Sequence, residues 1–236
     1  ASAAVLPLDM KAAASIVKRE NTRVAKLIGI NKAARTTCVK PAGTTSLVLG
    51  TSSGIHAWHN DYYIRRLRVG KNEAIYNYLK QNHQDLIKDE YFRPHDTAVI
   101  EIPQSAPKGS ILRTESAFDL LKRVKKVATE WVKPGHRNGS NTHNVSATIS
   151  LKEDEWDKAG KWMWDNRDCY NGLSVLPYDG GTYTQAPFED INKKEFEKLV
   201  KHLHDVNLEN VKEETDETDL SGELACAGGS CEITSL

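Results

Sequence analysis

Cysteine, long apolar runs and net charge are all scarce in this sequence of 236 residues, and each scarcity excludes a class of protein. Four cysteines are too few for the disulfide framework of a small secreted protein. No apolar stretch approaches the roughly 20 residues of a membrane span. The 32 basic and 32 acidic residues cancel, so no global field points to nucleic acid or membrane. We expect a reducing, cytoplasmic protein without nucleic-acid or membrane partners.

The two ends of the chain differ from its middle. The first residues, ASAAVLPLDMKAAAS, lack both an initiator methionine and the layout of a signal peptide. We therefore expect Ala1 to be a processed end or a cut through a longer chain. Residues 213–223 carry six acids and no base, and a glycine-rich stretch follows. Such a composition has little to bury, so we interpret residues 213–236 as a flexible tail.

Between these ends, patterns typical of helices alternate with patterns typical of strands. The expected helices span 10–30, 72–82, 115–133, 153–166 and 193–206, the first after an N-capping Asp9. The expected strands span 36–40, 62–69, 97–103, 143–151 and 172–177. This alternation predicts an α/β architecture with a mostly parallel sheet over residues 1–212.

A loop dense in glycine, serine and threonine, PAGTTSLVLGTSSGIHA, follows the first expected strand at residues 41–57. Gly43 lets a ligand approach the backbone, and backbone N–H groups at a following helix start favour an anion. Lys40 adds a positive charge. The loop matches neither a P-loop nor a dinucleotide fingerprint. A Ser/Thr-capped turn without a ligand is the simpler alternative, and the second cluster, residues 50–57, could line the same site.

Four segments together resemble the C-terminal part of a ribonucleotide reductase of the adenosylcobalamin-dependent class II: the loop at 41–57, NVSATISL, GLSVLPYDGGTYTQAPFEDI and the terminal CAGGSC. The resemblance covers most of residues 35–236. It implies the last strands of a ten-stranded α/β barrel and a loop that holds the phosphates of the ribonucleotide substrate. The implied phosphate-binding residues are Pro41, Ala42, Gly43, Thr44, Thr45 and Ser46.

The resemblance also gives a role to Cys226 and Cys231, which lie on the glycine-rich tail. In the family, such a pair reduces the active-site disulfide by thiol exchange, and thioredoxin or a similar donor resets it. Exchange requires an accessible thiolate, which a mobile tether permits. About sixteen flexible residues separate Asn210 from Cys226, which corresponds to an end-to-end distance of roughly 20–24 Å.

The class of reductase is inferred from what surrounds these segments. The oxygen-dependent class carries an adjacent tyrosine pair near its end, whereas Tyr62-Tyr63 comes too early and Tyr178 and Tyr183 are separated. The Arg-Val-Ser-Gly-Tyr context of the anaerobic class is absent. Class II uses adenosylcobalamin as its radical source. By position, the cofactor contacts would fall in residues 60–120 and 180–219.

The family's radical cysteine, in an Asn-Pro-Cys-Gly-Glu context, is not in this sequence. Cys38 and Cys169 lack that context, and we interpret them as structural. We expect the chain to need an N-terminal catalytic part that carries the radical cysteine and allosteric site, as a separate chain or a missing segment. The alternatives are a fragment of a class I reductase, or a phosphate-ligand-binding protein whose tail thiols sense redox state.

Two other patterns have simpler explanations. His202 and His204 could form a zinc site with the tail cysteines, but side chains at i and i+2 of a helix point apart. We therefore expect no metal site. The basic runs RRLRV (65–69) and KRVKK (122–126) are short and offset by acids. We interpret them as solvated faces or contacts to an anionic ligand.

Overall fold

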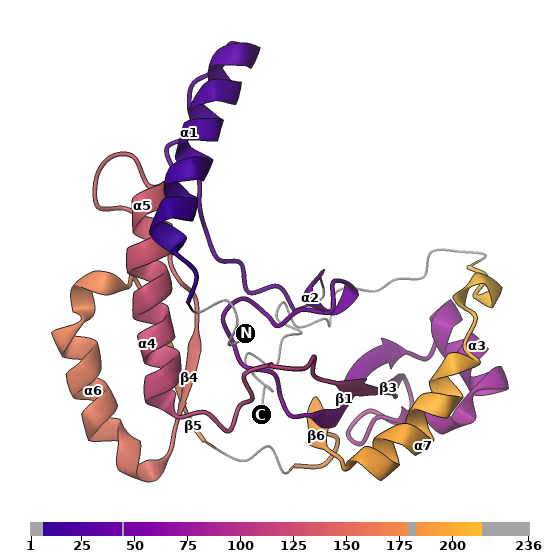
Figure 1. Cartoon of the computed structure of the whole chain (residues 1–236). Helices are drawn as coiled ribbons and strands as arrows, with labels where there is room; N and C mark the ends of the chain where they lie inside the picture. The colour runs from indigo at the N-terminus through magenta and orange to yellow at the C-terminus, as the bar shows by residue number, and fades with distance from the viewer. Residues whose placement is uncertain (1–6, 44, 179–182, 214–236) are drawn as a thin grey trace. The chain divides into compact units, whose positions relative to one another are not determined.

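The computed structural model describes residues 7–43, 45–178 and 183–213, which form two compact units (Figure 1). The first unit runs to Trp58 and resumes from Lys108 to Tyr178. The second comprises His59 to Pro107 and the described residues from 183 onward. Both units combine helices with strands, as the α/β prediction requires. None of the helices in these ranges is long and apolar enough to cross a membrane.

The first unit begins with helix α1 (Met10–Ile28), which starts as its sequence predicts and ends two residues before the expected end. The Asp9 side chain accepts a hydrogen bond from the Ala12 N–H at 2.9 Å, which satisfies one of the free donors at the helix start. The helix ends at Gly29, whose φ of 73° is a left-handed conformation that glycine adopts without strain. Helix α2 (Thr45–Val48) is a single turn within the loop at 41–57.

Helix α4 (Ala117–Val127) is the centre of the first unit. It continues through the π-helical turn η3 (Ala128–Val132) into α5 (Lys133–Gly135), so it runs slightly past the expected stop at Pro134. Gly135 is required there because a Cβ atom would lie 1.8 Å from Thr37 Oγ1. The η4 turn (Glu153–Glu155), α6 (Trp156–Asp165) and the η5 turn (Arg167–Cys169) complete the helical layer.

The core of this unit lies between α4 and a short parallel pair of strands. Strand β4 (Thr148–Leu151) pairs in parallel with β5 (Ser174–Pro177). Leu121 and Val124 of α4 and Ile149 of β4 are each at most 1% exposed. Burial of each such side chain contributes about 1.5–3 kcal/mol to stability, and this packing fixes the segments that enter the loop at 41–57.

Two strand predictions in this unit are wrong in extent. The expected strand 36–40 forms only isolated bridges, antiparallel between Arg35 and His136 and parallel between Val39 and Val145. The expected strand 143–151 begins at Thr148. Buried Val145 precedes β4 and makes only the single bridge to Val39, so ladder pairing begins later than the apolar pattern predicts.

The second unit is built on a four-stranded sheet in the order β2-β3-β1-β6. Strands β1 (Tyr62–Gly70) and β3 (Thr97–Ser105) pair over nine residues, from Tyr62 opposite Ser105 to Gly70 opposite Thr97. The short strands β2 (Ile87–Asp89) and β6 (Phe188–Asp190) pair at the two edges. Helices α3 (Ala74–Asn82) and α7 (Lys193–His204) and the turns η2 (Gln84–Leu86) and η6 (Leu208–Asn210) accompany the sheet.

All three pairings of this sheet are antiparallel, so the prediction of a mostly parallel sheet is wrong. The alternation of helix and strand patterns gave this wrong prediction because β2 and β6 span only three residues each, which is too short for a periodic signal. Within the described ranges the strands form no closed barrel. The predicted tail lies outside the described residues from position 214 onward.

Candidate functional site

The loop at 41–57 folds back so that its two Ser/Thr-rich clusters lie side by side. Gly54 has a φ of +56°, and a Cβ atom there would lie 3.3 Å from both Pro41 Cα and Val39 Cγ1. Backbone of the second cluster therefore packs directly against the first residues of the predicted phosphate loop. Gly54, within residues 50–57, thus lies beside this loop, and a binding site lined by both clusters stays a prediction.

The predicted phosphate-binding residues differ in how they are held. Pro41, Ala42 and Gly43 are half-buried, and Thr45 is exposed. Ser46 is 7% exposed, with its Oγ 3.4 Å from the Gly43 carbonyl oxygen to which it donates a hydrogen bond. The Ser46 carbonyl accepts from the Thr51 N–H at 2.8 Å, which closes the turn. Thr44 lies outside the described residues.

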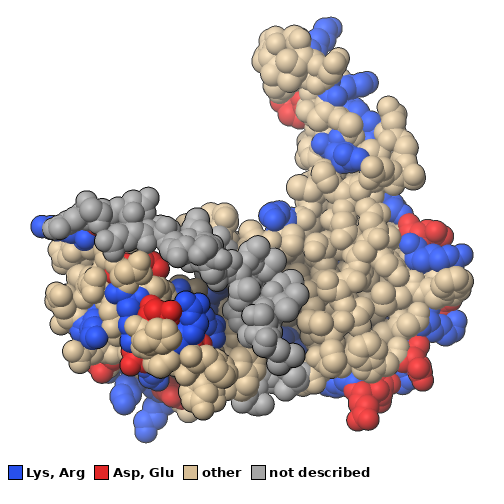
Figure 2. Space-filling model, turned by 180° about the vertical axis from the view of Figure 1, so that it is seen from behind, with Lys and Arg blue, Asp and Glu red and all other residues tan. Residues whose placement is uncertain are grey.

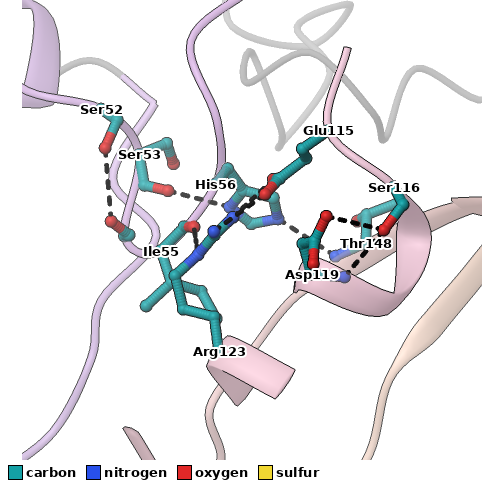
Figure 3. A network of polar contacts seen from close by, with 10 residues as sticks. Ser52, Ser53, Ile55, His56, Glu115, Ser116, Asp119, Arg123 and Thr148 are labelled. Atoms are coloured by element: carbon teal, nitrogen blue, oxygen red, sulfur yellow. Dashed lines mark hydrogen bonds and ion pairs between the residues drawn. The ribbon is translucent and has the colours of Figure 1, made fainter. Parts of the chain in front are cut away.

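His56 connects this loop to the first strand of the parallel pair (Figure 3). Its Nδ1 lies 2.8 Å from the Ser53 carbonyl oxygen, and its Nε2 lies 3.0 Å from the Thr148 backbone nitrogen. Because a backbone N–H can only donate, Nε2 accepts, so the proton is on Nδ1 and bonds Ser53. Burial lowers the pKa of His56, although the Ser53 hydrogen bond opposes this shift. The imidazole is therefore a neutral structural bridge.

Arg123 anchors the end of the same loop from helix α4 (Figure 3). Its Nε donates to the Ile55 carbonyl oxygen at 2.9 Å, and both Nη atoms donate to the two oxygens of Glu115. The side chains of Arg123 and Glu115 are 4% and 13% exposed. A bidentate pair of this kind fixes direction as well as distance. The interpretation of KRVKK as a solvated face is thus wrong for Arg123.

The structural roles of His56 and Arg123 were not predicted from the sequence. His56 lies within the loop at 41–57 directly after apolar Ile55, and this neighbouring apolar residue was the signal available in the sequence. Arg123 occupies the apolar face of α4 between Leu120 and Val124, both buried. A charged residue on the apolar face of an amphipathic helix indicates a buried partner. That signal was present in the sequence.

The described cysteines show no sign of redox chemistry. Cys169 is 7% exposed, and burial raises the pKa of its thiol, which disfavours the reactive thiolate. Cys38 is exposed and contributes its carbonyl oxygen to the Trp131 indole N–H at 3.0 Å. Cys226 and Cys231, the predicted redox pair, lie outside the described residues.

The stretches expected to contact a cofactor, 60–120 and 180–219, fall largely into the second unit. Residues 59–107 and 183–213 share its sheet through the pairing of β1 with β6. Residues 108–120 instead belong to the first unit, where they lead into α4. Most of the described residues of the two stretches thus belong to one unit, and residues 108–120 belong to the other.

Ion pairs of buried arginines stabilise the four-stranded sheet of the second unit. The interpretation of RRLRV (65–69) as a solvated face is therefore wrong for two of its arginines. Arg65 and Arg66 of RRLRV are 6% and 9% exposed, so they do not form a solvated face. The Arg66 Nε donates to Glu101 Oε1 at 2.8 Å, and its Nη2 pairs with Glu189 of β6. Arg65 lies over the Phe188 ring, 5.4 Å from its centroid. These arginines bind β6 to the sheet.

A hairpin between β2 and β3 exposes two aromatic rings. Tyr91 and Phe92 are 63% and 74% exposed, and their centroids lie 5.0 Å apart in an edge-to-face pair. The buried Glu90 carboxylate accepts from the backbone N–H groups of Phe92 and Arg93, both at 2.7 Å. Gln185 bridges the hairpin, accepting from the Tyr91 N–H and donating to the Asp89 carbonyl, both at 2.8 Å. The backbone that carries the exposed rings is therefore held by hydrogen bonds at both of these residues.

No group of three or more metal-ligating side chains occurs in the part of the chain that the structure describes. His202 lies near an acid of the same unit, with its Nδ1 3.5 Å from Asp85 Oδ2. The tail cysteines of the zinc alternative lie beyond the described residues, at positions 226 and 231.

Comparison with known proteins identifies the relatives of this chain. No protein-family profile matches it. It is 30% identical over 211 residues to the adenosylcobalamin-dependent ribonucleoside-triphosphate reductase of Lactobacillus gasseri and 29% identical over 209 residues to that of Lactobacillus acidophilus. The corresponding enzyme of Euglena gracilis is 26% identical over 228 residues. These alignments cover 87%, 87% and 92% of this chain, which spans only 27%, 27% and 29% of the three relatives.

The fold is similar to the crystal structure of a B12-dependent class II ribonucleotide reductase. The TM-score is 0.67 and the identity 25%, over 85% of this chain and 28% of that one. Sequence and fold therefore agree, and the resemblance to the class II reductases is confirmed.

Proposed function

We propose that this chain is the C-terminal portion of an adenosylcobalamin-dependent ribonucleotide reductase, which converts ribonucleotides to 2′-deoxyribonucleotides by radical chemistry. The observation that carries the proposal is the agreement of sequence and fold with this class of enzyme over at least 85% of the chain. Because the chain spans 27% of its Lactobacillus gasseri relative, the activity requires an N-terminal part with the radical cysteine. In the assembled enzyme, the two parts complete a ten-stranded barrel.

In this proposal, the loop at 41–46 binds the substrate's phosphates. Backbone N–H groups, together with the hydroxyls of Thr44 and Thr45, would donate to the phosphate oxygens, and Pro41 and Ser46 would flank them. The proposal is supported by the packing of Gly54 against Pro41, which fixes the entry to the loop. Arg123 adds support because it holds Ile55, the next residue along the chain. A loop held at both ends needs little reorganisation to bind an anion.

The second unit supplies part of the cobalamin-binding surface in this proposal. A corrin presents a broad apolar face, and paired exposed aromatic rings such as Tyr91 and Phe92 suit such a face. The hydrogen bonds of Glu90 and Gln185 would hold the hairpin backbone at these residues before the cofactor binds. The bound cofactor supplies the radical by cobalt–carbon homolysis. The role of this chain is to bind and orient.

In this proposal the tail, residues 213–236, returns the active-site thiols to their reduced state. Substrate reduction oxidises two thiols of the N-terminal part to a disulfide, and the Cys226–Cys231 pair reduces it by thiol–disulfide exchange, becoming a disulfide itself. Thioredoxin or a similar dithiol then reduces the tail. The composition of the tail supports this role, because an acidic and glycine-rich sequence has little apolar surface to bury.

The phosphate role is tested by an acid placed in the loop. Gly43→Asp puts a negative charge where the phosphates would lie, and we expect at least tenfold weaker ribonucleotide binding to the enzyme assembled with its N-terminal part. Gly172→Asp is the matched control, since Gly172 is an exposed glycine of the same unit with no atom within 4 Å of an added Cβ and no left-handed φ. Equal affinity of the two variants, measured by calorimetric titration, would remove the loop from the phosphate site.

A further inference from the structure

The turn at residues 53–56 packs directly against the entry of the predicted phosphate loop. A Cβ atom at Gly54, inside this turn, would lie 3.3 Å from Pro41 Cα and 3.4 Å from Pro41 N. The two backbone segments are therefore in contact without a side chain between them. Because packed interiors transmit small displacements, a movement of the turn also moves Pro41 and the residues that follow it.

His56 closes this turn and connects it to strand β4 (Figure 3). Its backbone N–H and its Nδ1–H both donate to the Ser53 carbonyl oxygen, at 3.1 and 2.8 Å. Its Nε2 accepts from the Thr148 N–H at 3.0 Å. One imidazole ring thus binds the turn to itself on one side and to the strand on the other.

The Thr148 N–H needs an acceptor outside the pair of parallel strands. In the peptide unit that joins Ala147 to Thr148, the carbonyl oxygen accepts from the Ser174 N–H of β5 at 3.1 Å. The N–H of a trans peptide points the opposite way from its carbonyl, so the Thr148 N–H points away from β5. A buried backbone donor without an acceptor is costly. His56 provides that acceptor.

The place that His56 fills belongs by register to the chain that enters the phosphate loop. Val39 bridges Val145 in parallel, and three residues further along both segments residue 42 would come opposite Thr148. The pairing is an isolated bridge, and the chain turns into the loop at Pro41. The His56 ring therefore stands in for a strand carbonyl where the loop leaves the strand.

The position of this loop matters because the surface offers an anion little general attraction. The 32 basic and 32 acidic residues cancel, and Figure 2 shows the two kinds interspersed on the face that it presents. A phosphate would then be held by hydrogen bonds from a few N–H and hydroxyl groups, which weaken steeply when they are misaligned. A loop fixed in advance keeps these donors aligned before the substrate binds.

We propose that His56 is a positioning residue for phosphate binding: its ring holds the turn at 53–56 on β4, and the turn sets the position of the loop at 41–46. The inference rests on the proposed phosphate role of that loop. Arg123 holds the same turn at the Ile55 carbonyl, 2.9 Å from its Nε. Because this second anchor remains, loss of the bond to Thr148 should displace the loop more than it unfolds the unit.

Two substitutions separate the two bonds of the ring. The side-chain amide of glutamine reaches the position of Nε2, so His56→Gln keeps an acceptor for Thr148, whereas His56→Asn reaches only the position of Nδ1. In the enzyme assembled with its N-terminal part, His56→Asn should raise the KM for a ribonucleoside triphosphate about tenfold and leave kcat within about threefold. His56→Gln should keep both constants within about threefold of the natural enzyme.

Hydrogen exchange at the Thr148 amide tests the bond itself, independently of activity. Exchange should be about tenfold faster in His56→Asn than in the natural protein, and unchanged in His56→Gln. The matched control is His143→Asn, the same chemical change at an exposed histidine of the same unit. It should alter neither the KM nor the exchange at Thr148.

Gly54→Ala tests the same path without touching the ring. Its added methyl group presses on Pro41 from within the turn, at 3.3 Å from Pro41 Cα. It should also raise the KM, by about threefold or more, and spare kcat. An unchanged KM in this variant would overturn the proposal, and this comparison decides it even where His56→Asn does not fold.

The remaining outcomes separate this inference from the proposed function. A higher KM in His56→Asn with natural behaviour in His56→Gln supports the positioning role. A lower kcat at unchanged KM in His56→Asn indicates only a loss of folded enzyme and overturns it. If Gly43→Asp weakens ribonucleotide binding while the His56→Asn and Gly54→Ala variants do not, the loop binds phosphates and this inference alone fails. If Gly43→Asp also has no effect, the phosphate role fails and this inference with it.

Discussion

The guanidinium of Arg123 lies 2.9 Å from the carbonyl oxygen of Ile55, a residue 68 positions earlier in the chain. This hydrogen bond fixes the end of the loop at 41–57 to the most buried helix of its unit. The charge is retained inside the fold because Glu115 neutralises it through two further hydrogen bonds. The position of the candidate phosphate loop therefore depends on the buried ion pair between Arg123 and Glu115.

Removal of the Arg123 side chain should be strongly destabilising. Arg123→Ala leaves the Glu115 carboxylate, 13% exposed, without its counter-charge. Breaking a buried pair in this way costs about 3–5 kcal/mol in the free energy of unfolding. Lys122→Ala removes the neighbouring base, whose side chain is 73% exposed, and should change stability by less than about 0.5 kcal/mol. Urea unfolding of the two variants measures the difference, and equal losses would refute the anchoring role.

His56 should make the stability of the protein depend on pH. Burial lowers the pKa of His56 in the folded chain, while the unfolded chain has an ordinary value of about 6.5. The unfolded state therefore binds more protons as the solution is acidified, so the stabilisation is present above about pH 6.5 and is lost as the pH falls below it. His56→Gln should flatten this dependence. Urea midpoints between about pH 5.5 and 8 compare the two proteins, and parallel profiles would contradict the assignment.

A side chain at position 54 should destabilise the protein. Gly54→Ala combines the strain of a left-handed residue, about 1–2 kcal/mol, with crowding against Pro41 and Val39 at 3.3 Å. Gly139→Ala has a similar φ of +81° and nothing within 4 Å of the added atom, so it reports the strain alone. We expect the Gly54 variant to be the less stable of the two in thermal unfolding. Equal melting temperatures would show that the two clusters of the loop can separate freely.

Local sequence signals predicted much of this structure. Helix α1 begins after Asp9, and strand β1 begins at Tyr62, as expected. The apolar period of α4 and its Ser116 cap, which accepts from the Asp119 N–H, also act locally. Elements of this kind are specified by neighbours in the chain, so their patterns survive in a single sequence.

The rest depends on partners that are distant in sequence. Strand β6 is three residues long and is fixed by Glu189 pairing with Arg66, 123 positions earlier. The antiparallel direction of the sheet follows from such contacts, which no local pattern records. At the candidate site, His56 finds its acceptor and donor at Ser53 and Thr148, so composition alone indicated a loop without indicating what holds it.

The tail thiols should matter only when the reductant is a protein. With Cys226→Ser and Cys231→Ser together, turnover driven by thioredoxin should be lost, because a large donor cannot reach a buried disulfide. Turnover driven by a small dithiol should remain, since that reagent reaches the site directly. Cys38→Ser, at an exposed cysteine outside the tail, should leave both activities unchanged. Loss of both activities in the tail variant would contradict the shuttle.

The central claim is that this chain acts as part of a cobalamin-dependent ribonucleotide reductase. The most direct test is to isolate the chain from its native source with whatever is bound to it and assay ribonucleotide reduction with and without adenosylcobalamin. The account predicts reduction that requires adenosylcobalamin, in the presence of a polypeptide that carries an Asn-Pro-Cys segment. Reduction that proceeds equally well without the cofactor would contradict the assignment to class II, and the absence of any reduction in either assay would contradict the proposed function.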